Sequence, residues 1–128
     1  MRSVAREIVF QYVFARLFNQ GDEGLFAVLA QNLSADDKSF AESLLNAVTE
    51  NENLFHEELE NLSHNFSSER IFAADRCAIY IGMAELKCFK NTPKAVAIDE
   101  AVKLSAKFST EKSTDFVNGI LAEYSKRF

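Results

Sequence analysis

Few residues in this chain have types and spacings suited to catalysis. Adjacent carboxylates occur at Asp36–Asp37 and at Asp99–Glu100. Neighbours on a helix point about 100° apart, so helix capping or exposure to solvent explains both pairs. The sequence contains no glycine-rich phosphate loop, no nucleophile elbow and no histidine–carboxylate pair at a fixed spacing. We therefore expect that the protein is not an enzyme.

Metal and thiol chemistry are equally sparse. His56 and His64 lack a second pair of ligands at metal-binding spacing, which predicts two solvated histidines and no metal or other cofactor. Cys77 and Cys88 fall on one predicted helix, where eleven residues separate them by roughly 16 Å. A disulfide requires Cα atoms within about 7 Å. We therefore expect two unpaired cysteines that pack as small core residues.

Charge is distributed unevenly along the chain, and this favours binding chemistry. Residues 1–69 hold four Lys/Arg against twelve Asp/Glu, a net charge of −8, while residues 70–128 hold ten against seven, a net of +3. Arg2 and Arg6 are four residues apart and share one face of a helix. A protein of net charge −5 with such basic zones holds a polyanion weakly and with strong salt dependence. Ordinary solvated faces are the alternative explanation.

An amide and a glycine interrupt the last predicted helix, "STDFVNGILAEY". An interior glycine costs a helix about 1 kcal/mol relative to alanine, so Gly119, like Gly82, predicts a close approach of another helix. Asn118 beside it needs hydrogen-bond partners if it is buried, or a ligand if it lies at the rim.

The fold class follows from composition and periodicity. One proline, four glycines and 48% hydrophobic residues, with apolar residues repeating every three to four positions, predict an all-α protein of about seven helices. Ser34 is the expected N-cap of the third helix and Thr92 that of the sixth, with Pro93 at its first position. The loop-like stretch near residue 67 predicts two small bundles, residues 1–66 and 67–128, which together form one compact domain. The expected helices cover residues 3–19, 25–32, 34–48, 54–62, 74–89, 93–108 and about 111–124.

The sequence also bears on location. It has no run of about 18 apolar residues that would span a membrane. Its charged first segment lacks the pattern of a secretory signal. We expect a cytoplasmic protein with no membrane partner.

Three stretches resemble the bacterial transcription antitermination factor NusB family. They are "AREIVFQYVF" (5–14), "DRCAIYIGMAEL" (75–86) and "TPKAVAIDEAVKLSAKFSTEKSTDFVNGIL" (92–121). The resemblance implies a non-enzymatic helical protein that binds boxA-type single-stranded RNA of ribosomal RNA leader transcripts. It also implies two protein partners: NusE, the small ribosomal subunit protein that doubles as an antitermination factor, and the RNA polymerase antitermination complex.

The resemblance implies an RNA-binding role for five residues. Arg2 and Arg6 match family arginines that face the RNA backbone, and Gln11 matches a motif glutamine on the same helix. Phe116 and Asn118 match the FVNG residues near the RNA. These roles suit the side chains, because arginine contacts phosphates and an exposed Phe stacks on an unpaired base for roughly 1–3 kcal/mol.

Three further residues are expected at the protein partner's surface. Phe14 stands where the family often has Tyr, Asp75 falls at a position associated with the NusE contact, and Tyr80 occupies the place of a family arginine. Core burial remains the alternative for Phe14 and Phe116.

The chain also departs from the family pattern. Ser3 and Val4 stand where further arginines commonly occur, Ala84 replaces a frequent tyrosine, and Lys112 replaces a common acidic residue. Fewer cations predict lower RNA affinity and greater reliance on NusE. Two alternatives stay open: a helical protein-binding adaptor without RNA recognition, and an RNA module related to ribosomal RNA methyltransferases. The sequence leaves open whether the protein is a monomer or a homodimer.

Overall fold

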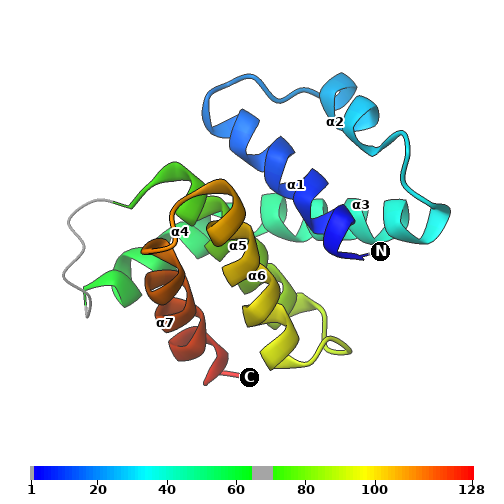
Figure 1. Ribbon diagram of the computed structural model, residues 1–128. Coiled ribbons are helices and arrows are strands. Elements are labelled where there is room, and N and C mark those ends of the chain that lie inside the picture. The colour runs from blue at the N-terminus through cyan, green and yellow to red at the C-terminus, as the bar shows by residue number, and fades with distance from the viewer. Residues whose placement is uncertain (1, 65–70) are drawn as a thin grey trace.

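The computed structural model describes residues 2–64 and 71–128, and these contain seven helices and no strand (Figure 1). The predicted all-α fold is therefore confirmed. The expected boundary between residues 66 and 67 lies outside the described residues, so the division into two bundles stays a prediction. The helices are α1 (Arg2–Leu17), α2 (Glu23–Ala30), α3 (Ala35–Glu50), α4 (Glu52–Ser63), α5 (Ala73–Cys88), α6 (Lys94–Phe108) and α7 (Ser113–Ser125).

Local capping sets several helix ends. The Ser34 hydroxyl accepts a hydrogen bond from the Asp37 backbone N–H at 3.2 Å, which confirms the predicted N-cap of α3. Helix α1 ends at Leu17, and Asn19 beyond it has a left-handed φ of 59°, while the Gln20 N–H donates back to the Ala15 carbonyl as in a Schellman motif. The cap predicted at Thr92 is wrong, because Pro93 itself is extended and is the N-cap of α6.

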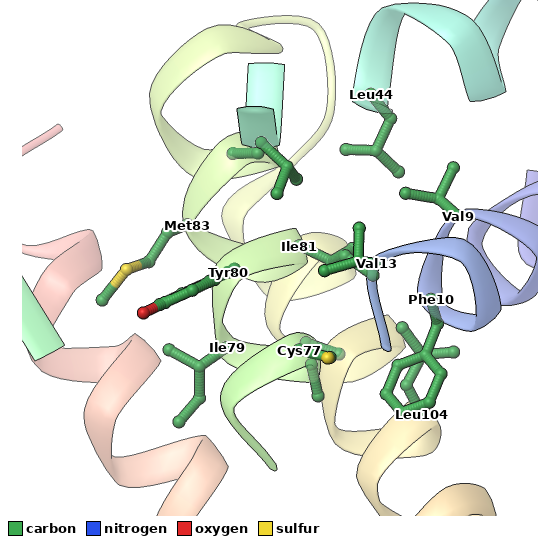
Figure 2. Packing of buried hydrophobic residues seen from close by; sticks show 14 of the residues in the cluster. Val9, Phe10, Val13, Leu44, Cys77, Ile79, Tyr80, Ile81, Met83 and Leu104 are labelled. Atoms are coloured by element: carbon green, nitrogen blue, oxygen red, sulfur yellow. The ribbon is translucent and has the colours of Figure 1, made fainter. Parts of the chain in front are cut away.

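Helix α5 forms the centre of the molecule. It packs against α1, α3, α4, α6 and α7. Figure 2 shows Ile81 of α5 on the side of Val9, Val13 and Leu44, while Met83 lies on the other side of the same helix. A helix surrounded in this way is expected to be apolar all round. Its buried charged residues, Asp75 and Glu85, are the exceptions that need a physical explanation.

Gly82 lies where α5 meets α6 and α7. A Cβ atom placed on it would lie 2.5 Å from Leu121 Cδ1 and 3.1 Å from Ala101 Cβ. Both distances are shorter than van der Waals contact, and both neighbours are buried. The predicted close approach is confirmed for Gly82, whereas the similar prediction for Gly119 stays a prediction.

We expect Gly82→Ala to lower the free energy of unfolding by about 1–2 kcal/mol. Overpacking a filled core costs about 1–3 kcal/mol, and alanine's better helix propensity returns at most about 1 kcal/mol. Urea unfolding followed by circular dichroism measures the change. Gly24→Ala in α2 is the control, since its Cβ would meet only Asp22 Oδ1 at 3.3 Å. A Gly82→Ala variant as stable as the Gly24→Ala variant would contradict the close approach.

The two cysteines differ in exposure, while both histidines lie at the surface. Cys77 is buried, and burial raises the pKa of its thiol to about 12, so the thiol stays protonated. Cys88 is exposed, so its predicted core position is wrong. His56 and His64 are exposed as predicted. Within residues 2–64 and 71–128 no group of His, Cys, Asp or Glu is arranged to hold a metal ion, and no helix is long and apolar enough to cross a membrane.

Candidate nucleic-acid interface

The first turns of α1 carry a buried ion-pair network. Arg6 Nε donates to Glu85 Oε2 and Arg6 Nη2 donates to Glu85 Oε1, each at 2.7 Å. Arg6 Nη1 lies 3.5 Å from Glu100 Oε1, and Ser3 Oγ donates to the same carboxylate oxygen at 2.8 Å. Arg6 is 4% exposed and Glu85 is fully buried. This network fixes the start of α1 to α5 and α6.

The network buries Arg6, which was expected to face the RNA backbone. Burial alone acts to lower the pKa of Arg6, but the hydrogen bonds and charge of Glu85, with the charge of Glu100, raise it. The guanidinium therefore stays charged, and its charge is paired with the carboxylates of Glu85 and Glu100. In this arrangement Arg6 does not reach solvent, so a direct phosphate contact by Arg6 is unsupported, and its place is structural.

Arg2 has the exposure that Arg6 lacks. Its guanidinium carbon lies 4.6 Å from the centre of the Phe40 ring, a cation–π contact with α3. It borders an open hollow of about 890 Å³ between the start of α3 and the α5–α6 connection. Lys90 and Asp37 line the same hollow. Arg2 thus presents a positive charge at the surface while its guanidinium contacts the Phe40 ring.

An aromatic ridge continues along α1 beyond the arginines. Phe10 stacks on Phe108 of α6 with ring centres 4.6 Å apart, and Phe14 lies one turn further on, 6.1 Å from Phe10. Phe14 is 36% exposed, and Gln11 beside it is also exposed. Together these four residues line a shallow hollow of about 310 Å³. Gln11 and Phe14 are therefore accessible from solvent, and their contact with a ligand stays a prediction.

A third hollow, of about 700 Å³, lies where α5 and α7 begin, and we call it the α5–α7 hollow. Its lining consists of Ile71, Phe72, Asp75, Thr110, Glu111, Lys112, Ser113 and Phe116. Asp75 is only 3% exposed, and its Oδ1 atom has no hydrogen-bond partner among the described residues. A buried carboxylate oxygen without a partner is costly, so this atom of Asp75 needs a physical explanation.

The last two expected RNA residues lie on α7. Phe116 is half-buried and borders the α5–α7 hollow, while Asn118 is exposed. Both are therefore accessible at least in part. Asp75 and Glu85 are ten residues apart on α5. The hollow therefore lies about 15 Å along the helix axis from the Arg6–Glu85 ion pair.

Tyr80 is placed in the core rather than at a surface. It is 3% exposed, and its ring lies 6.2 Å from that of Phe55. Its hydroxyl accepts a hydrogen bond from Arg76 Nη1 at 3.0 Å, while burial raises the pKa of the phenol. The direct protein contact expected of Tyr80 is not available in this arrangement, because the core encloses the side chain.

Comparison with known proteins now decides the family. The model of the NusB family matches residues 2–126, nearly the whole chain. The chain belongs to the NusB family. It is similar to the transcription antitermination protein NusB of Methylacidiphilum infernorum, with 33% identity over 125 residues that cover 94% of this chain and 87% of that protein. The NusB of Geobacter sulfurreducens is 32% identical over 126 residues, covering 95% of this chain and 91% of the relative.

Solved NusB structures share the fold. The structure of T. maritima NusB superposes with a TM-score of 0.85 at 26% identity, covering 98% of this chain and 91% of that one. A structure of antitermination factors NusB and NusE in complex with double-stranded RNA also superposes with a TM-score of 0.85, at 24% identity, and covers 99% of this chain and 97% of that chain. At 24% identity, the similarity to this complex shows only that the two chains share a fold.

Sequence reasoning about the NusB motifs missed two residues that the structure brings forward. Phe72 is 53% exposed at the rim of the α5–α7 hollow, directly before α5 begins. Its signal in the sequence is a large apolar residue at a helix N-cap position, where polar caps are preferred. Phe40 is the second such residue: periodicity predicts a core position on α3 but not its contacts with Arg2 and Arg6.

Proposed function

We propose that this chain is an RNA-binding adaptor of transcription antitermination that binds boxA-type single-stranded RNA together with NusE. The observation that carries the proposal is a match to the NusB family over residues 2–126, in a chain whose expected ligand residues are mostly accessible. Arg2, Gln11, Phe14 and Asn118 are exposed, and Phe116 is half-buried.

The proposed division of labour follows from the chemistry of each part. Arg2 supplies a phosphate contact, the partly exposed ring of Phe14 offers a face for an unpaired base, and Phe116 would meet the RNA at the rim of the α5–α7 hollow. The α5–α7 hollow is mostly apolar and contains the unpartnered Oδ1 of Asp75, which suits a protein segment with a hydrogen-bond donor. NusE would therefore insert at the hollow while the RNA follows α1.

Wider assembly belongs to the same proposal. Bound to NusE and RNA, the adaptor would join RNA polymerase in the cytoplasm during ribosomal RNA synthesis, as a binding protein without catalytic activity. The exposed part of α1 around Phe14 and Phe18 is also the surface that a homodimer would cover. A dimer of that kind would compete with RNA for Phe14.

The RNA part of the proposal is tested with a single arginine variant. We expect Arg2→Ala to weaken binding of boxA-type RNA to the complex with NusE. The slope of log K against log salt should become shallower by about 0.7, the contribution of one phosphate contact to a single strand. Fluorescence anisotropy across a salt series measures both quantities. Arg2 is changed alone, because an Arg6 variant would also disturb the buried network.

Lys126→Ala is the matched control, since Lys126 is an exposed cation at the far end of α7. It should leave the salt slope unchanged. If the parent protein and NusE form no complex with RNA at low salt, the proposed function is wrong. If the parent binds RNA but Arg2→Ala binds it equally well at every salt concentration, the protein-binding adaptor without specific RNA recognition becomes the better reading.

A further inference from the structure

Two arginines share one aromatic ring at the start of α1. The Phe40 ring centre lies 4.6 Å from the guanidinium carbon of Arg2 and 5.2 Å from that of Arg6. Phe40 belongs to α3 and is only 6% exposed. The ring therefore contacts the exposed arginine and the buried one, and joins the surface charge to the interior network.

Electrostatics explains how two cations can occupy neighbouring positions. Like charges this close repel each other, but Arg6 is paired bidentately with Glu85 and also lies near Glu100. The buried carboxylates cancel the charge of Arg6. Arg2 lies at the surface, where its charge interacts with the Asp37 carboxylate, so an external anion would compete with that carboxylate while the ring supports the guanidinium.

We propose that Phe40 is a positioning residue for RNA binding, which acts by holding the Arg2 guanidinium over its ring in the orientation that meets a phosphate. This inference rests on the proposed function. An arginine side chain carries large rotamer entropy, and restraining it before association reduces the ordering cost of binding. Phe40 itself would not touch the RNA.

The competing explanation is that Phe40 only fills the core. Its ring lies 5.5 Å from Phe89 in an edge-to-face arrangement, and it belongs to the main hydrophobic cluster. Loss of that packing would lower stability in any background. A role through Arg2, in contrast, must disappear when Arg2 is absent, so the two explanations differ in a double-mutant cycle.

The experiment measures the affinity of boxA-type RNA for the NusE complex of four proteins: the parent, Phe40→Leu, Arg2→Ala and the double variant. We expect Phe40→Leu to weaken binding about two- to fivefold, the range of a cation–π contact at a partly exposed site. In the Arg2→Ala background it should have no further effect. Phe55→Leu is the matched control for loss of a core ring, because Phe55 is fully buried in α4, where its ring contact is with Tyr80.

A second measurement does not depend on RNA. The side-chain Hδ and Hε resonances of Arg2 should be shifted upfield by the Phe40 ring and should return to ordinary values in Phe40→Leu. Unshifted Arg2 resonances in the parent would overturn the inference. An equal loss of RNA affinity with and without Arg2, or no loss at all, would overturn it while leaving the proposed function intact. A parent protein that binds no RNA would overturn both.

Discussion

Replacing Glu85 with alanine is expected to lower the free energy of unfolding by about 3–5 kcal/mol. Glu85 is fully buried and receives two hydrogen bonds of 2.7 Å from Arg6. Removing it leaves a buried guanidinium whose nearest remaining carboxylate is that of Glu100, at 3.5 Å. The cost is that of an uncompensated buried charge, which greatly exceeds the worth of an exposed ion pair. Urea unfolding monitored by circular dichroism gives the value directly.

Two further variants separate the cost of an unpaired charge from the worth of the pair. Glu123→Ala removes an exposed carboxylate that pairs with Lys126, and should change stability by at most about 1 kcal/mol. The double variant Arg6→Met/Glu85→Leu removes both charges and should recover most of the stability, because apolar replacement of a buried pair is often neutral or favourable. A Glu85→Ala variant no less stable than Glu123→Ala would contradict the network.

Periodicity and glycine placement predicted the helical architecture because both are local properties. Seven apolar stripes gave the seven helices, with ends correct to within a few residues. Gly82 predicted a helix contact, since only a missing side chain permits the approach of Leu121 and Ala101. The sequence motifs likewise led to the family that the comparisons establish.

The placement of individual site residues was harder to predict, because it depends on partners distant in sequence. Arg2 and Arg6 have the same type and share a helix face, yet one is exposed and the other buried. The difference arises from Glu85, 79 residues away from Arg6. Tyr80 similarly faces the core because α5 is enclosed on several sides. A count of charges along the chain therefore overstates the positive charge that α1 offers to an anion.

Because little of the positive charge on α1 is available to an anion, RNA binding by this protein should depend strongly on NusE. With Arg6 neutralised and Lys107 paired to Glu7, the exposed face of α1 presents few free cations. RNA affinity from charge alone should then be low. Contacts in the α5–α7 hollow would have to supply much of the stability of a ternary complex, which places Asp75 at the point of largest effect.

Asp75→Ala is expected to weaken NusE binding by about 2–5 kcal/mol, roughly 30- to 4,000-fold, the cost of removing one member of a buried charged hydrogen bond at an interface. The same change should leave the free energy of unfolding within about 1 kcal/mol of the parent. It relieves an oxygen that has no partner in the described residues, and it forfeits a first-turn carboxylate worth about 0.3–1 kcal/mol to α5.

This combination of effects distinguishes a docking carboxylate from a structural one. A residue that holds the fold together would lose stability and binding together when truncated, whereas Asp75 should lose binding alone. Asp115→Ala is the matched control, because Asp115 is also a first-turn carboxylate, on α7, but is exposed. Calorimetric titration of each variant with NusE, beside urea unfolding of each, measures both quantities. If Asp75→Ala binds NusE as tightly as Asp115→Ala does, the unpartnered oxygen serves something other than this partner.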